Sequence, residues 1–291
     1  MYVAILNDTG ASWRWDRAEW NDTGVWYALA EGTTEWYISN ETVASWPEWE
    51  DGHTYTVRVY ACDRAGNGGI TTSIYITFTY DTTPPTSWIH SKNPDKYWYT
   101  SGDLPIWIHI EADDGELNES TYYYLNTSLW YKYSPDNKTW TDWIFYGYGE
   151  YITSWFISFD PPQGDGFYQL MTIARDPAGN VENKTDPDPN GSIGVDTTLP
   201  EIEITIPENG GYYASVTNIT GYVYDATSGV KSVHVQILNE SGYSWTGATW
   251  SSAESWLTAN LIYENDTNNS AIWYINSNLP SWENTKGYTV K

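Results

Sequence analysis

The sequence contains a single cysteine, Cys62, so no disulfide can form within the chain. Basic residues are also scarce: 13 Lys and Arg stand against 38 Asp and Glu, which leaves a net charge of -25. A surface of this charge repels nucleic-acid phosphates and anionic lipids, and we expect neither as a partner. No stretch approaches the roughly 18 apolar residues of a membrane span, so we expect no membrane insertion in this segment.

Catalytic and nucleotide-binding motifs are absent from the sequence. It has no Gly-x-Ser-x-Gly, no phosphate-binding loop, no His-Glu-x-x-His and no Cys-x-x-Cys. The four histidines are isolated from one another, and we interpret them as members of solvated strand faces rather than metal ligands or general bases: His53, His90, His109 and His234. We therefore predict that the chain is not an enzyme and requires no cofactor.

Aromatic residues dominate what is present. There are 19 Trp and 26 Tyr, but only 5 Phe and 2 Met. Rings with a polar group suit half-exposed β-sheets better than buried helices. Apolar and polar residues alternate with period two in 106–110 and 201–206, which predicts half-buried antiparallel strands, and no stretch carries a helical stripe. These patterns indicate an all-β chain.

Two markers recur at nearly the same interval. Ala-Cys-Asp-Arg-Ala-Gly-Asn at 61–67 returns as Ala-Arg-Asp-Pro-Ala-Gly-Asn at 174–180, 113 residues later. Asp-Thr-Thr-Pro-Pro at 81–85 returns as Asp-Thr-Thr-Leu-Pro at 196–200, 115 residues later. Repeated sequence at a fixed interval indicates tandem structural units, here of about 115 residues.

This repeat divides the chain into three parts. Residues 81–195 are one whole repeat, 1–80 correspond to the C-terminal part of a repeat, and 196–291 to the N-terminal part of another. We therefore expect the chain to be a window on a longer array. The Asp-x-Ala-Gly-Asn runs predict hairpins with Asp at the start of the turn and Gly in the left-handed conformation.

A tyrosine opens the penultimate strand of each repeat after a glycine-containing corner: Tyr55, Tyr168 and Tyr288. Immunoglobulin-type sandwiches place a tyrosine there, with its hydroxyl tied to the preceding loop. About seven short strands fit into each repeat. We therefore predict tandem immunoglobulin-like antiparallel β-sandwiches with Greek-key connections.

The middle repeat resembles the Ig-like repeats of archaeal and bacterial surface proteins. The resemblance rests on the Asp-Thr-Thr-Pro-Pro linker, the Asp-x-Ala-Gly-Asn hairpin, and the segments 129–134, 140–143, 155–159 and 164–168. It covers the middle repeat well and the flanking repeats loosely. It implies an extracellular sandwich used in surface layers, adhesins, filaments and stalks of secreted enzymes.

N-glycosylation sequons are unusually frequent. Chance gives roughly four or five such acceptors in a chain with this Ser and Thr content. The sequence has twelve: Asn7, Asn21, Asn40, Asn118, Asn126, Asn137, Asn183, Asn190, Asn218, Asn239, Asn265 and Asn268. The excess indicates a glycosylated, extracellular or cell-surface protein, although Asn and Thr are also common in polar β-rich chains. We expect occupied sites first at Asn137 and Asn190, which lie in turns.

The topology also predicts a calcium site. In an immunoglobulin-type sandwich the B–C and F–G loops lie at one end, which we expect to be where the chain enters. In the middle repeat this end gathers oxygen ligands suited to Ca²⁺ from three segments: Asp81, Asp113, Asp114, Glu116, Asp176 and Asn180. Asp196 and Asp225 begin the same arrangement in the next repeat. Turn chemistry alone also accounts for Asp-x-Ala-Gly-Asn.

These observations predict a non-catalytic structural component of a cell-surface layer, filament or stalk, with neighbouring copies or repeats and attached glycans as partners. A second hypothesis is a carbohydrate-binding module that stacks sugars on exposed rings. Its candidates are Trp13, Trp15, Trp20, Trp26, Trp245, Trp250 and Trp256. A third is the passive stalk of a secreted enzyme, which predicts the same sequence here.

Overall fold

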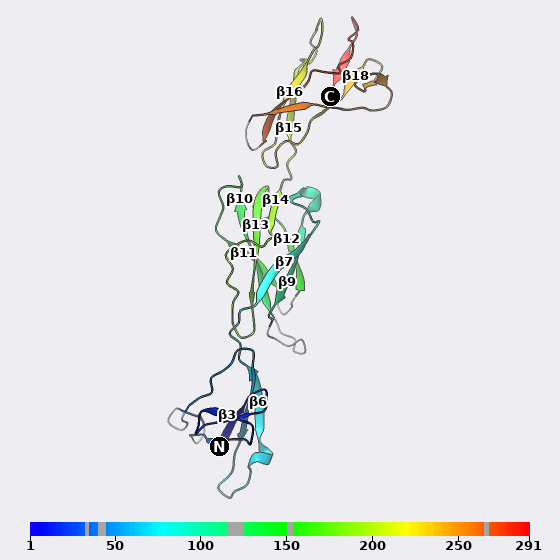
Figure 1. The fold of residues 1–291 in the computed structure, drawn as a ribbon. Coiled ribbons are helices and arrows are strands. Elements are labelled where there is room, and N and C mark those ends of the chain that lie inside the picture. The colour runs from blue at the N-terminus through cyan, green and yellow to red at the C-terminus, as the bar shows by residue number, and fades with distance from the viewer. Residues whose placement is uncertain (33–34, 40–44, 116–124, 150–153, 265–267) are drawn as a thin grey trace.

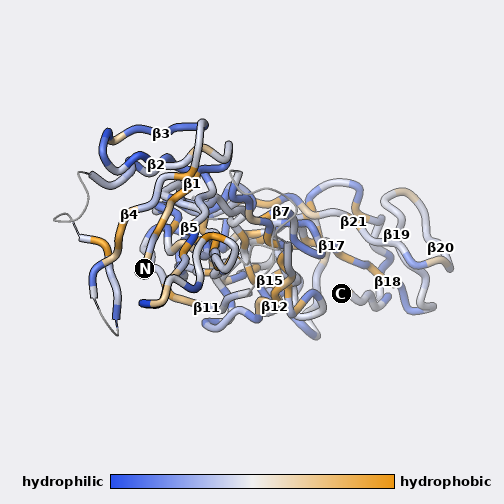
Figure 2. The backbone as a smooth tube through the Cα atoms, turned by 90° about the horizontal axis from the view of Figure 1, so that it is seen from below, coloured by the Kyte–Doolittle hydropathy of each residue, from blue (hydrophilic) through white to orange (hydrophobic). Residues whose placement is uncertain are grey.

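The computed structural model describes residues 1–291 except 33–34, 40–44, 116–124, 150–153 and 265–267. Its strands fall into three groups that follow one another along the molecule (Figure 1). Within the described residues, strands pair only inside each group. In that same part of the chain no helix is long and apolar enough to span a membrane. Figure 2 shows short hydrophobic stretches separated by hydrophilic ones throughout.

The first group forms one antiparallel sheet in the order β3-β2-β1-β5-β6, with β4 also paired to β1. Its core packs Ile5, Ala28 and Tyr55 against two tryptophans, Trp13 and Trp15. The elements are β1 (Tyr2–Leu6), β2 (Ser12–Arg14), β3 (Glu19–Asn21), β4 (Ala28–Leu29), β5 (Thr54–Tyr60), the 3₁₀ turn η1 (Ile70–Thr72) and β6 (Ile74–Thr79).

The middle group is a two-layer sandwich. One layer is β12-β9-β7 and the other is β11-β10-β13-β14-β8. The chain changes layer early, because β7 pairs with β9 whereas β8 pairs in parallel with β14 in the opposite sheet. The elements are β7 (Thr86–Asn93), β8 (Trp98–Tyr99), the 3₁₀ turn η2 (Ser101–Asp103), β9 (Ile106–Asp113), β10 (Asn126–Ser134), β11 (Ile144–Gly149), β12 (Ser154–Phe159), β13 (Gly166–Arg175) and β14 (Ser192–Val195).

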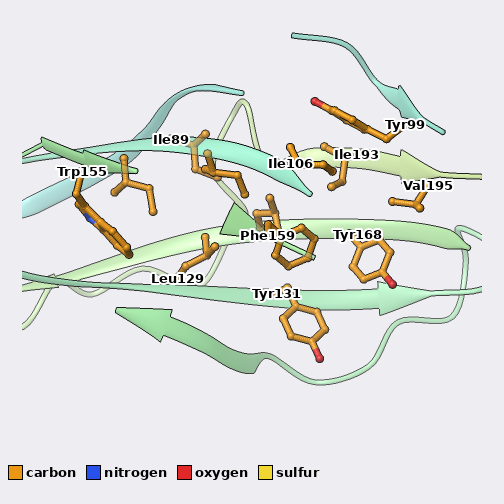
Figure 3. Close-up of a cluster of buried hydrophobic side chains, with 13 residues drawn as sticks. Ile89, Tyr99, Ile106, Leu129, Tyr131, Trp155, Phe159, Tyr168, Ile193 and Val195 are labelled. Carbon is orange, nitrogen blue, oxygen red and sulfur yellow. The ribbon is translucent and has the colours of Figure 1, made fainter. Parts of the chain in front are cut away.

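The core of this sandwich comes from alternate residues of both layers. Ile106, Ile108 and Ile110 of β9 are buried, as the period-two pattern predicts. In Figure 3, Ile89 of β7 and Leu129 of β10 point into the same interior from opposite layers. The predicted class is confirmed: the chain is all-β and built of tandem immunoglobulin-like repeats, and the middle repeat is a two-layer antiparallel sandwich.

The third group contains two four-stranded sheets, β15-β16-β23-β22 and β20-β19-β18-β24, and the pair β17-β21. The strands are β15 (Glu201–Ile206), β16 (Ile219–Tyr224), β17 (His234–Val235), β18 (Ile237–Asn239), β19 (Ser244–Trp245), β20 (Trp250–Ser251), β21 (Leu257–Thr258), β22 (Asn260–Tyr263), β23 (Ser270–Ile275) and β24 (Tyr288–Val290).

The period-two pattern predicts the wrong burial for β15. All six of its residues are exposed, including Ile202, Ile204 and Ile206. The strand pairs antiparallel with β16, but no opposing layer among the described residues buries its apolar side. Alternation therefore predicts the strand correctly, while burial depends on a second sheet that the strand's own sequence does not specify.

The predicted tyrosine corners are present in all three groups. The backbone N–H of Glu50, Gln163 and Glu283 each donates to a tyrosine hydroxyl five residues later, at 2.9, 3.1 and 2.9 Å. The Tyr168 hydroxyl also donates to the Gly164 carbonyl at 2.9 Å. Each such bond contributes about 1 kcal/mol. Burial raises the pKa of Tyr168, so the hydroxyl keeps its proton for this bond.

Candidate metal centre

Three carboxylates meet where the first linker enters the middle sandwich. Asp81 comes from the linker, Asp114 follows β9, and Asp176 begins the turn after β13. One carboxylate oxygen from each lies within 4.8 Å of the other two. Ca²⁺ holds its oxygen ligands at about 2.3–2.6 Å, so ligands on opposite sides of one ion lie up to about 5 Å apart. The three groups can therefore share one ion.

The hairpin at 174–180 fixes the position of Asp176. Its Oδ1 accepts hydrogen bonds from the backbone N–H of Gly179 at 2.7 Å and of Asn180 at 2.9 Å. Gly179 has a φ of 103°, the left-handed conformation that the turn requires. The corresponding Gly66 has a φ of 88°. The hairpin prediction is confirmed, and the turn leaves Oδ2 of Asp176 for another partner.

That second oxygen is buried and accepts no hydrogen bond within the described structure. Asp176 is only 5% exposed and forms no ion pair with Lys or Arg in the described part of the chain. A buried, uncompensated carboxylate oxygen costs several kcal/mol, which a bound cation offsets. Oδ2 is therefore the strongest sign that the cluster binds a ligand.

The electrostatics of Asp81 point the same way. Burial raises the pKa of Asp81, and the negative charges of Asp176 and Asp51 add to this rise, while a hydrogen bond from Thr83 opposes it. The Asn180 amide donates to the Asp81 carbonyl at 3.1 Å and to its Oδ1 at 3.3 Å, which holds the linker against the hairpin. Burial and the neighbouring carboxylates thus disfavour the ionised form of Asp81, whereas a divalent cation favours it.

The structure gathers only part of the predicted ligand set. Asp81, Asp114, Asp176 and Asn180 meet as expected. Asp113 lies outside the cluster: it ends β9 and is exposed, because alternate residues of a strand face opposite sides. Glu116 lies outside the described residues.

At the second linker the equivalent acids, Asp196 and Asp225, accept hydrogen bonds from backbone N–H groups. Asp196 accepts from Ser228 N–H at 3.0 Å, and Asp225 accepts from Gly229 N–H at 2.7 Å. Both are buried. No third metal-ligating side chain joins them in the described part of the third group, so the first linker carries the more complete centre.

Both linkers are held by the corner that precedes them. Asp51 accepts hydrogen bonds from the backbone N–H and hydroxyl of Thr82 and from the hydroxyl of Thr83. In the next repeat, Asp165 accepts from the N–H and hydroxyl of Thr197 at 2.9 and 2.8 Å and from the hydroxyl of Thr198 at 2.6 Å. We call these two arrangements the linker clamps. Sequence reasoning missed them, although the repeated Asp-Gly corner and Thr-Thr pair carry the signal.

Two of the tryptophans that the sequence offers as sugar-stacking candidates on the first group are not exposed. Trp13 and Trp15 are 5% and 7% exposed and belong to the core. Trp20, Trp245 and Trp250 are half-buried. Trp26 and Trp256 are exposed, and the Arg14 guanidinium lies 4.0 Å from the centre of the Trp26 ring.

A different aromatic surface lies on the outer face of the middle sandwich. Trp130, Phe145 and Tyr148 line a shallow hollow over β10, β11 and β13, together with the sequon residue Asn126. The Trp130 and Phe145 rings meet edge to face at 5.5 Å, and the Phe145 and Tyr148 rings lie 6.2 Å apart. Phe145 and Tyr148 are exposed.

The sequons are distributed over all three groups. Of the described ones, five are exposed: Asn126, Asn137, Asn183, Asn190 and Asn268. Asn7, Asn21, Asn218 and Asn239 are half-buried, and Asn40, Asn118 and Asn265 lie outside the described residues. Asn137 occupies a turn with a φ of 57°. Asn190 fits less well than expected, because its Nδ2, the atom that carries a glycan, donates to the Ile89 carbonyl at 3.2 Å.

Two further residues that the sequence presents as isolated lie together. His90 and His109 meet beside Glu111 on the outer face of β7 and β9. Cys62 is free, as the only cysteine of the chain must be, and it is exposed.

Comparison with known proteins found neither a matching protein-family model nor a matching curated protein. Solved structures gave matches at low similarity. A tetra-tandem repeat from the extending region of a large adhesion protein is 13% identical, with a TM-score of 0.32, and the alignment covers 93% of this chain and 57% of that one. The FN1-FN3 domains of chicken CNTN1 are 11% identical, with a TM-score of 0.24 and coverage of 99% and 81%. Domains A168-A170 of titin are 11% identical, with a TM-score of 0.28 and coverage of 99% and 80%.

Proposed function

We propose that this chain is a non-catalytic structural segment of an extracellular, N-glycosylated array, in which immunoglobulin-like repeats act as spacers of a surface layer, filament or stalk. The linker clamps carry this proposal, because the same three hydrogen bonds hold both linkers to the preceding corner. A joint that recurs with the repeat suits a segment whose length and direction matter.

We further propose that Ca²⁺ binds Asp81, Asp114 and Asp176 and stiffens the first joint. The buried Oδ2 of Asp176 supports this proposal, as does the raised pKa of Asp81. Three carboxylates supply part of the six to eight oxygen ligands of Ca²⁺, and backbone carbonyls or water complete the shell. The ion cross-links the linker to two loops of the sandwich.

Small-angle X-ray scattering of the full chain tests the spacer function. We expect a narrow, extended distance distribution in Ca²⁺ and a broader one with a shorter mean length for Asp51→Ala combined with Asp165→Ala. The matched control is Asp142→Ala with Asp186→Ala, which removes the same charge from exposed sites away from the linkers. An unchanged distribution in the clamp variant contradicts the proposal.

Glycosylation is tested by glycopeptide analysis of protein from its native host. We expect added sugar at Asn137 and Asn183, where the side chains are exposed. We expect less at Asn190, because its amide nitrogen is engaged with β7. Absence of sugar from both Asn137 and Asn183 contradicts the proposed glycosylated exterior.

The aromatic hollow favours carbohydrate binding as a second candidate function. Sugar rings stack on exposed aromatic faces, and Trp130, Phe145 and Tyr148 present three such rings together. Glycan-array binding that is lost in Trp130→Ala and Phe145→Ala but kept in Trp107→Ala supports this function. Trp107 is an equally large exposed ring on the opposite sheet and serves as the control. Absence of binding leaves the spacer function as the better explanation.

A further inference from the structure

The outer face of the β12-β9-β7 sheet gathers two imidazoles and one carboxylate. His109 and Glu111 are two residues apart on β9 and therefore lie on the same face. The pairing of β7 with β9 shifts register between Ile89 and Ser91, so His90 lies at a β-bulge. A bulge re-aims one side chain relative to the regular ladder. Here it places His90 beside the two residues of β9.

The distances within this group match the requirements of a tetrahedral metal ion. His90 Nδ1 lies 3.2 Å from Glu111 Oε2, and His109 Nε2 lies 3.8 Å from Glu111 Oε1. All three residues offer a ligand atom within 4.8 Å of the others. Bonds of about 2.0–2.1 Å at the tetrahedral angle separate ligand atoms by about 3.4 Å. Small side-chain rotations therefore suffice to hold one ion.

Neighbouring side chains hold the imidazoles in place. The His109 ring stacks on Phe156, with centroids 4.3 Å apart and planes inclined by 12°. The His90 ring meets the His109 ring edge-on at 4.9 Å. The Ser154 hydroxyl lies 2.7 Å from His109 Nε2, and an arriving ion displaces this hydrogen bond. The ligands are thus partly oriented before an ion arrives, which reduces the entropic cost of binding.

We propose that His90, His109 and Glu111 bind a divalent transition-metal ion of the Zn²⁺ class and that the ion cross-links β7 to β9. Two imidazole nitrogens and a carboxylate suit Zn²⁺, whereas Ca²⁺ prefers oxygen ligands alone. The site is therefore chemically distinct from the carboxylate centre at the linker. Three protein ligands leave a fourth position for water, and the exposure of His90 directs that position toward solvent.

Titration of the untagged full chain with Co²⁺ tests this proposal, with 5 mM Ca²⁺ present to occupy the carboxylate centre. We expect one equivalent of Co²⁺ to give the intense visible absorption of a four-coordinate ion, which one equivalent of Zn²⁺ then removes. His90→Ala and Glu111→Gln are expected to abolish this absorption. His234→Ala, an exposed strand histidine in the third group, is the matched control and leaves it unchanged.

Folding of each variant is checked by far-ultraviolet circular dichroism, and Glu111→Gln keeps the shape of the side chain. Absence of the four-coordinate signal in the unmodified chain overturns the proposal. Persistence of the signal in both His90→Ala and Glu111→Gln overturns it as well. Either result leaves the scattering test of the spacer function unaffected.

Discussion

The hairpins at 61–67 and 174–180 share the pattern Asp-x-Ala-Gly-Asn but use their asparagine differently. In the first, the Asn67 amide returns to its own turn and donates to Asp63 Oδ2 at 2.8 Å. In the second, the Asn180 amide reaches the linker residue Asp81, and Asp176 Oδ2 is buried without a hydrogen bond in the described structure. The turn is thus the same in both, and the arriving linker converts the second into a candidate site.

The carboxyl groups at the two hairpins differ in the direction of their pKa shifts. Hydrogen bonds from Asn67, first from its side chain and then from its backbone, lower the pKa of Asp63. Burial raises the pKa of Asp81 beside the second hairpin. The first turn therefore stabilises a carboxylate, whereas the second surrounds one with other acids. A motif explained fully by turn chemistry in one place can carry a ligand in another.

Asp176→Asn is expected to have the largest effect, because it removes the carboxylate that distinguishes the second hairpin from the first. The amide keeps an Oδ1 acceptor for the turn and removes the buried charge, so the variant should melt higher than the parent in EDTA. Ca²⁺ at 100 times its dissociation constant should stabilise the parent by about 2.7 kcal/mol and the variant by close to nothing. Calorimetric melts of the full chain measure both effects.

The control for that experiment is Asp63→Asn, which should leave the response to Ca²⁺ intact because its hairpin lies away from the centre. If millimolar Ca²⁺ does not change the melting of the parent chain, the second hairpin does not differ from the first by binding Ca²⁺.

The tyrosine corners at the start of β13 and β5, the strands that lead into the two hairpins, can be compared by removing each hydroxyl. Tyr168→Phe removes two hydrogen bonds from a buried hydroxyl and should lower the free energy of unfolding by about 2 kcal/mol. Tyr55→Phe removes the bond from Glu50 and should cost about 1 kcal/mol. Urea unfolding measures both, and equal losses contradict the idea that the middle corner is more tightly tied.

The pH dependence without metal should have opposite signs in the two regions. Asp81 has a raised folded pKa, so its contribution to stability is present below its unfolded value of 3.8 and is lost as pH rises through the folded pKa. Asp63 has a lowered folded pKa, so its contribution is present above 3.8 and is lost as pH falls through the folded pKa.

Melting in EDTA from pH 3 to pH 7 tests these signs. Relative to the parent, Asp81→Asn should become more stable as pH rises, and Asp63→Asn should become less stable. Parallel curves for the two variants are incompatible with the opposite shifts.

The smallest expected effect concerns the free thiol. Cys62 is exposed beside the first hairpin, so it should react fully with a thiol reagent in the folded chain and shift the melting midpoint negligibly. A fluorophore attached there should not respond to Ca²⁺, because the first hairpin lies outside the carboxylate centre. A clear fluorescence response to Ca²⁺ would contradict this expectation and show that the first hairpin is coupled to the carboxylate centre.

Much of this architecture could be predicted from the sequence, because it depends on local pattern. The interval between repeats, the turn glycines and the corner tyrosines all follow from residue type and spacing. The meeting of Asp81, Asp114 and Asp176 follows from loop order in an immunoglobulin-type sandwich. Burial of Trp13 and exposure of Ile204 could not be predicted, because each depends on which surface lies opposite.

The pairing of His90 with His109 was missed for a different reason. It depends on one extra residue in the register of β7, and a bulge has no reliable signature in a single sequence. The two histidines are neighbours in space although they are 19 positions apart in the chain.

The linker clamps have a consequence for shape on a larger scale. In the proposed array, a series of identical joints would turn the long axis by the same angle at each repeat. The axis would then follow a helix whose pitch is set by the geometry of the joint. Asp165 and its two threonines therefore act on geometry far beyond their own contacts. In the proposed array, a few degrees of change at each such joint, multiplied along many repeats, would alter the curvature of the whole array while each repeat keeps its fold.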